Sequence, residues 1–122
     1  MPEDIEPAGA GDCLFCRFVT GEVPLELVHE STGTIAFADI APQAPTHVLV
    51  VPRAHHRTAA DLVEREPDLM AELVRAAAAV AARSGLERGY RLVLNTGPDA
   101  QQSVHHVHLH LLGGRSFGWP PG

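Results

Sequence analysis

The sequence predicts a single α+β domain built on a mainly antiparallel sheet. Its 122 residues suit one domain and leave no room for a second core. Five short apolar segments have the length and composition of strands. One long helical segment lies between the third and the fourth of them, whereas helices alternate with strands in a parallel α/β sheet. We expect residues 12–122 to form this domain and residues 1–11, rich in Pro, Glu, Gly and Ala, to be a disordered lead-in.

The predicted strands are short runs of apolar residues, mostly bounded by turn residues. The third is continuously apolar and ends at Pro52, which cannot donate a ladder hydrogen bond. By residue number the five segments are 25–29, 34–38, 47–51, 90–95 and 105–112.

Two helices are predicted, one short and one long. The short helix covers residues 13–19, with Asp12 as its N-cap and Gly21 at its end. The long helix begins at Pro67, because proline suits a first turn, and stops before Gly85. Its apolar residues repeat at helical spacing, which predicts one buried face.

The composition excludes several classes of function. The net charge of -6 argues against nucleic acid or an anionic membrane as the main partner. No lysine occurs, which excludes Schiff-base chemistry and the lysine of phosphate-binding loops. The N-terminal residues lack the pattern of a signal peptide, and no apolar run approaches the roughly 20 residues that span a bilayer. We therefore expect a cytoplasmic protein.

Three histidines alternate along the last predicted strand. His106, His108 and His110 should point to one face, about 6.6 Å apart at successive steps. The apolar residues between them should enter the core, and His105 belongs to that second face. Such a row has three interpretations: a solvated polar face, an open zinc site, or a nucleophilic imidazole that attacks phosphorus.

Neutral hydrogen-bonding side chains nearby favour the nucleophile. Gln102 and Ser103 lie just upstream, and Asn95 ends the preceding strand. These groups suit phosphate oxygens or a leaving group and are poor zinc ligands.

Three segments together resemble the histidine-triad (HIT) family, namely residues 102–115, 37–47 and 119–122. The last two resemble its Hint branch. The resemblance implies a homodimer in which two five-stranded sheets join, without an organic cofactor. It implies hydrolysis of purine nucleoside phosphoramidates, such as adenosine 5′-phosphoramidates, and of acyl adenylates to the nucleoside monophosphate. The alternatives are a dinucleoside polyphosphate hydrolase, a nucleotidyl transferase, or a nucleotide-binding adaptor with incidental turnover.

The resemblance also assigns roles to residues. His108 becomes the nucleophile that is transiently nucleotidylated, and its catalytic partners are His110, His106, Ser103 and His47. The nucleotide-binding residues are Asp39, Ile40, Phe15, Phe18, Val23, Phe37, Asn95, Gln102 and Trp119. Two of these assignments have simpler alternatives: the phenylalanines as core, and Asp39 as the cap of the following turn. A nucleophilic histidine must be neutral, so we expect activity to fall below about pH 6, near the ordinary pKa of histidine.

A pair of cysteines near the N-terminus departs from the better-known Hint sequences. Cys13 and Cys16 resemble, with His55 and His106, the zinc ligands of other bacterial histidine-triad proteins. Two thiolates and two imidazoles make a closed tetrahedral set that suits structural zinc. The alternatives are two buried thiols or a redox pair, with His56 as a different fourth ligand. A zinc ligand at His106 puts its role in proton transfer in doubt.

Overall fold

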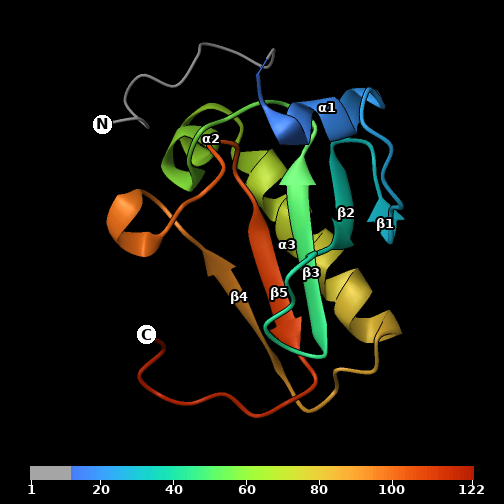
Figure 1. The fold of residues 1–122 in the computed structure, drawn as a ribbon, viewed down its shortest axis with the longest axis vertical. Coiled ribbons are helices and arrows are strands. Elements are labelled where there is room, and N and C mark those ends of the chain that lie inside the picture. The colour runs from blue at the N-terminus through green and yellow to red at the C-terminus, as the bar shows by residue number, and fades with distance from the viewer. Residues whose placement is uncertain (1–11) are drawn as a thin grey trace.

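A computed structural model describes residues 12–122, and the predicted disorder of residues 1–11 lies outside this range. The strands of the described part form one sheet in which every pairing is antiparallel (Figure 1). Their order is β1 (His29–Glu30), β2 (Thr34–Ala38), β3 (Thr46–Pro52), β5 (Leu109–Gly113) and β4 (Tyr90–Leu94). The predicted α+β class and antiparallel sheet are confirmed.

The helices are α1 (Leu14–Thr20), α2 (Ala59–Arg65) and α3 (Pro67–Arg83), with a 3₁₀ turn at Pro98–Ala100. The long helix is confirmed, but the expectation of only one further helix is wrong. Helix α2 has seven residues and is capped by Thr58, whose hydroxyl accepts the Asp61 N–H. Only Glu66 separates α2 from α3. In residues 12–122, no helix combines the length and hydropathy needed to cross a membrane.

The N-cap of α1 is Cys13 rather than the predicted Asp12. The Cys13 Sγ accepts the Cys16 N–H at 3.4 Å, so the first turn folds around the thiol. Gly21 ends the helix as predicted, with φ of 84°, in the left-handed region that glycine tolerates best.

The sheet separates two apolar clusters. Helices α2 and α3 cover one face, where the larger cluster includes Leu73, Val80, Leu109 and Leu111. In the view of Figure 1, α3 lies behind the sheet and α1 covers one end of the opposite face. The smaller cluster lies under α1 and consists of Cys13, Phe15, Cys16, Ile35, Phe37, Leu49 and Val51. The histidines lie beside this smaller cluster.

Candidate active site and metal centre

The three alternating histidines lie where β5 begins. The strand starts at Leu109, four residues later than predicted, so His106 and His108 precede it. The alternation holds nevertheless, because Val107 and Leu109 pack in the cluster under α3. On the other face, the ring centroids of His108 and His110 lie 5.1 Å apart, and Phe15 contacts the rings of His106 and His108.

His106 uses both ring nitrogens within the protein. Its Nε2–H donates to the Pro52 carbonyl at 2.8 Å, so its Nδ1 carries a lone pair. That Nδ1 lies 3.4 Å from the sulfurs of both Cys13 and Cys16 and 3.1 Å from His55 Nδ1. The residue is fully buried, and burial lowers its pKa to about 4. Both ring nitrogens of His106 thus face groups of the protein itself, and the catalytic role that the resemblance implied for its side chain stays a prediction.

His108 has one engaged and one free ring nitrogen. Its Nδ1–H donates to the backbone carbonyl of His106 at 2.9 Å, which leaves the lone pair on Nε2. Burial lowers its pKa, partly offset by that hydrogen bond and by the charge of Asp39. His108 thus presents a neutral, oriented nitrogen lone pair, which is what a nucleophile requires.

His110 presents an N–H donor instead of a lone pair, because His47 fixes its tautomer. The Gln43 N–H donates to His47 Nδ1 at 3.0 Å, so the proton of neutral His47 is on Nε2. His47 Nε2 lies 2.9 Å from His110 Nδ1 and 3.4 Å from an Asp39 carboxylate oxygen. His110 accordingly accepts at Nδ1 and carries its proton on Nε2, a buried atom without a hydrogen-bond partner among residues 12–122. Burial, followed by the neighbouring rings of His108 and His47, lowers the pKa of His110 to about 4.

The Nε2–H of His110 is suited to binding a ligand. A buried donor without a partner costs about 1–3 kcal/mol. The same donor gains a partner when an oxygen of a bound phosphate lies against it. His108 and His110 therefore offer a lone pair and a donor side by side.

Cys13, Cys16, His55 and His106 fit a tetrahedral metal ion. Their ligand atoms all lie within 4.8 Å of one another. Three of the sulfur–nitrogen distances are 3.3–3.4 Å, and the two Nδ1 atoms are 3.1 Å apart. Tetrahedral zinc with ordinary bond lengths separates sulfur and nitrogen by about 3.6 Å and two nitrogens by about 3.3 Å. His56, the alternative ligand, instead contacts Glu66 at 2.5 Å.

Asp39, His47 and His110 also lie within 4.8 Å of one another but fit a metal poorly. The Gln43 N–H occupies His47 Nδ1. A metal ion at Nε2 would then require an imidazolate, whereas metals bind neutral imidazole. This second group is better suited to holding the ring protons of His47 and His110 on particular nitrogens.

The three aromatic rings predicted to line a purine slot form one cluster. The centroids of Phe15, Phe18 and Phe37 are separated by 5.3–6.0 Å, and Phe15 also contacts His108 at 5.3 Å. The cluster lies directly beside the candidate nucleophile.

Comparison with known proteins agrees with this arrangement. The HIT domain model matches residues 20–117. The chain belongs to the HIT family. An uncharacterised HIT-like protein of Synechococcus elongatus is 43% identical over 111 residues, covering 91% of this chain and 97% of that protein. A 14 kDa zinc-binding protein of Zea mays is 44% identical, covering 89% and 87%. The crystal structure of a HIT family hydrolase from Legionella pneumophila superposes with a TM-score of 0.86 at 46% identity, covering 91% of this chain and 100% of that one.

The remaining predicted site residues of this HIT domain are spread more widely. Asp39 uses one oxygen to cap its turn, accepting the Ala41 N–H at 2.8 Å, and directs the other toward His47. The amide of Gln102 donates to the carbonyls of Arg57 and Val104, which leaves it without a free N–H for a ligand. Its Oε1 accepts the Gly97 N–H, so Gln102 holds the loop before the histidines.

Five further residues predicted to bind or catalyse lie outside these contacts. Val23 and Asn95 are half-buried, and Ser103 is exposed near the histidines in sequence. Ile40 is fully exposed and does not join the phenylalanine cluster. Trp119 is 83% exposed and lies against Arg91 of β4.

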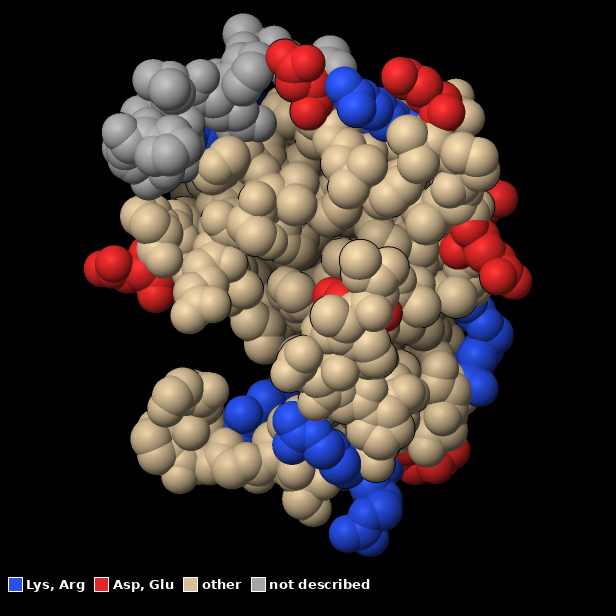
Figure 2. All heavy atoms as spheres, viewed as in Figure 1, with Lys and Arg blue, Asp and Glu red and all other residues tan. Residues whose placement is uncertain are grey.

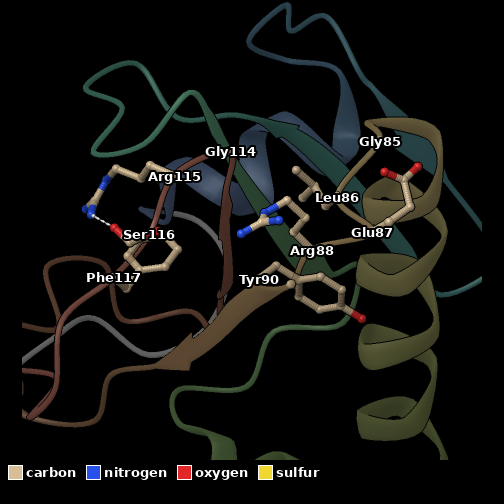
Figure 3. A pocket seen from close by; sticks show the side chains of 10 residues that line it. Gly85, Leu86, Glu87, Arg88, Tyr90, Gly114, Arg115, Ser116 and Phe117 are labelled. Carbon is tan, nitrogen blue, oxygen red and sulfur yellow. Dashed lines mark hydrogen bonds between the residues drawn. The ribbon is translucent and has the colours of Figure 1, made fainter.

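The HIT domain also has a cavity of about 580 Å³ beyond the end of β5, distinct from the histidine site. Arg115, Ser116 and Phe117 form one wall, and Leu86, Arg88 and Tyr90 lie across from them (Figure 3). Arginine side chains gather near this end of the face shown in Figure 2, whereas the centre of that face carries little charge.

The sequence did not point to the backbone groups that orient the rings. The Pro52 and His106 carbonyls and the Gln43 N–H fix the three tautomers. Every residue carries such groups, so only the fold selects them.

Proposed function

We propose that this protein is a purine nucleoside phosphoramidase of the Hint branch. It cleaves adenosine 5′-phosphoramidates, and acyl adenylates, through a nucleotidyl-His108 intermediate. The observation that carries the proposal is the pairing of a fixed Nε2 lone pair on His108 with an Nε2–H on His110 that has no hydrogen-bond partner within residues 12–122. A pure nucleotide-binding adaptor needs no oriented nucleophile.

The reaction divides into two displacements. His108 Nε2 forms a bond to phosphorus while the P–N bond breaks, and the His106 carbonyl stabilises the imidazolium that results. Ser103, exposed near the site in sequence, passes a solvent proton to the leaving nitrogen, since an unprotonated amine leaves poorly. In the second step water attacks phosphorus while the bond between phosphorus and His108 Nε2 breaks. The proton of the attacking water passes to solvent, and the nucleoside monophosphate leaves His108 neutral. The His110 N–H binds a phosphoryl oxygen in both steps.

Aromatic and acidic side chains beside the histidines support a nucleoside substrate. The Phe15, Phe18 and Phe37 cluster offers an apolar surface for a purine. The Asp39 oxygen that does not cap the turn is an anionic acceptor suited to ribose hydroxyls.

We propose structural zinc at Cys13, Cys16, His55 and His106. The ion would cross-link α1 to the segments before α2 and before β5, and it takes no part in the two displacements. It would hold His106, whose carbonyl orients the nucleophile. A pair of cysteines that face two imidazoles instead of forming a disulfide also fits a reducing, cytoplasmic location.

We also propose a homodimer formed along β4, an edge strand of the sheet. Tyr90, Leu92 and Leu94 are 37–40% exposed on the face that α3 covers elsewhere. Exposed apolar residues on an unpaired edge favour pairing with a second strand.

The decisive experiment measures hydrolysis of adenosine 5′-phosphoramidate by wild type, His108→Ala and His105→Ala. We expect His108→Ala to lose about 10³-fold or more of kcat. His105, the neighbour on the other side of the strand, is the matched control and should be close to wild type. Mass spectrometry of acid-quenched or rapidly denatured wild-type reactions should find one nucleotidyl group on His108. Equal rates for wild type and His108→Ala refute the proposal, and faster cleavage of diadenosine polyphosphates than of the phosphoramidate favours the alternative hydrolase.

A further inference from the structure

Arg115, at the start of the C-terminal tail, contacts the loop residue Gln43, which is hydrogen-bonded to His47. Its Nε and Nη2 donate to the Gln43 carbonyl at 3.2 and 3.1 Å. On the other side of the same residue, the Gln43 N–H donates to His47 Nδ1 at 3.0 Å. Gln43 is thus held between a guanidinium and a site imidazole.

The Gln43 N–H has a specific chemical consequence. An N–H pointing at His47 Nδ1 excludes a proton from that atom and places it on Nε2. His47 then donates to His110 Nδ1 at 2.9 Å, which leaves the His110 proton on the partnerless Nε2. If the peptide group that bears the Gln43 N–H turned away, the rings of His47 and His110 would both be free to exchange tautomers.

The surrounding contacts hold Arg115 in place. Its Nη1 donates to the Ser116 carbonyl at 3.0 Å, and its guanidinium lies 4.2 Å from the centre of the Phe117 ring. Figure 3 shows Arg115, Ser116 and Phe117 together on one wall of the cavity beyond β5. Gly114 brings the chain onto the loop, since an added Cβ would lie 2.9 Å from Pro45, and its φ is +93°.

From these contacts we propose that Arg115 is a positioning residue: through the Gln43 carbonyl it holds His47 in the Nε2–H tautomer and so keeps the His110 donor aimed at the substrate. The guanidinium fork places two donors on one carbonyl, which a single ammonium group does not reproduce. The kinetic consequence rests on the proposed hydrolase, whereas the tautomer of His47 does not.

Arg91 provides a matched control. It also lies over the Phe117 ring, at 5.1 Å, and donates to a tail carbonyl, that of Gly118. It contacts the same tail as Arg115 but makes no hydrogen bond to Gln43 in the described part of the chain.

The test is ¹⁵N NMR of histidine-labelled full-length protein, with the His47 signals assigned by His47→Gln. In wild type we expect the two His47 ring nitrogens to be widely separated, as in a fixed neutral tautomer. In Arg115→Met the two signals should move toward each other, and in Arg115→Lys they should lie between. Arg91→Met should match wild type. Unchanged signals in Arg115→Met overturn the proposal, as does an equal change in Arg91→Met.

Two further measurements complete the test. If Arg115→Met fails to fold, Arg115→Lys decides: a reduced separation supports the proposal and a wild-type separation overturns it. With adenosine 5′-phosphoramidate, kcat of Arg115→Met should fall about 10-fold while KM changes less than about 2-fold, because a displaced donor affects the chemical step. Altered His47 signals without turnover in any variant refute the hydrolase and leave the positioning role standing.

Discussion

His108 donates its Nδ1 proton to the backbone carbonyl of His106 across 2.9 Å. The candidate nucleophile is therefore oriented by the main chain of a residue whose side chain faces two cysteines. The proposed metal ligation and the orientation of the candidate nucleophile thus meet in one residue.

Activity should persist at a lower pH than the sequence alone predicts. Burial lowers the pKa of His108, and it lowers that of His110 to about 4, so both rings keep their neutral form to a lower pH than an ordinary histidine. The acidic limb of kcat should thus lie below the ordinary histidine pKa of about 6.5. Initial rates between pH 4.5 and 8 would show this, with the His108→Ala rate subtracted at each pH because phosphoramidates hydrolyse in acid. A limb at the ordinary histidine pKa would contradict it.

The same burial makes folding pH-dependent with a definite sign. Unfolded His110 binds a proton below about pH 6.5, whereas folded His110 does so only near about pH 4. Its neutral form thus contributes fully above pH 6.5, and stability falls as the pH drops from about 6.5 to 4. Urea unfolding at several pH values tests this, and a free energy of unfolding that stays constant across that window would speak against it.

Protein purified without added zinc should contain about one zinc ion per chain. Cys13→Ser removes one ligand, so metal content and Tm should both fall, because binding to the folded state stabilises it. Elemental analysis and thermal unfolding measure the two effects.

His56→Ala is the control for the zinc site. His56 is the chain neighbour of His55, but its ring contacts Glu66. This variant should keep its zinc. Retention of the ion by Cys13→Ser, or its absence from wild type, would exclude the proposed ligand set.

Leu92→Glu should shift the protein from dimer to monomer. Leu92 is 37% exposed on the edge strand β4, and a charge there opposes pairing with a second apolar edge. Light scattering after size exclusion should change from about twice to about once the chain mass of 13.0 kDa. Val63→Glu on α2, at a residue 47% exposed, should remain dimeric. A monomeric wild type would refute the dimer.

The antiparallel sheet and the shared face of the three histidines could be predicted from the sequence, although the predicted start of the last strand was four residues too early. Residues 106–108 precede β5, yet their side chains still alternate, since Val107 packs under α3 while His106 and His108 contact Phe15. Helix α2 escaped prediction because Leu62 is the only buried residue among its seven, so no apolar repeat at helical spacing marks it in the sequence. Cys13 displaced Asp12 as the cap of α1, and its thiol now faces His106.

The surroundings of the His106 ring could not be predicted from the sequence for a different reason. Motif position gave it a phosphate contact, whereas the Pro52 carbonyl and the two cysteines occupy both ring nitrogens. The orientation of an imidazole depends on the groups that surround it in space, and here these come from segments 54 to 93 residues away. Spacing along the chain contains no such information.

The division of the core by the sheet bears on how this protein tolerates change. No side chain of the cluster under α3 takes part in the hydrogen bond between His108 and the His106 carbonyl. Exchange of these side chains for others of similar volume should therefore change stability more than activity. The cluster under α1 includes both cysteines and Phe15, whose ring contacts His106 and His108. Random mutagenesis followed by selection for activity should therefore recover many substitutions behind the sheet and few in front of it. Substitutions intended to raise Tm are therefore best placed in the cluster under α3.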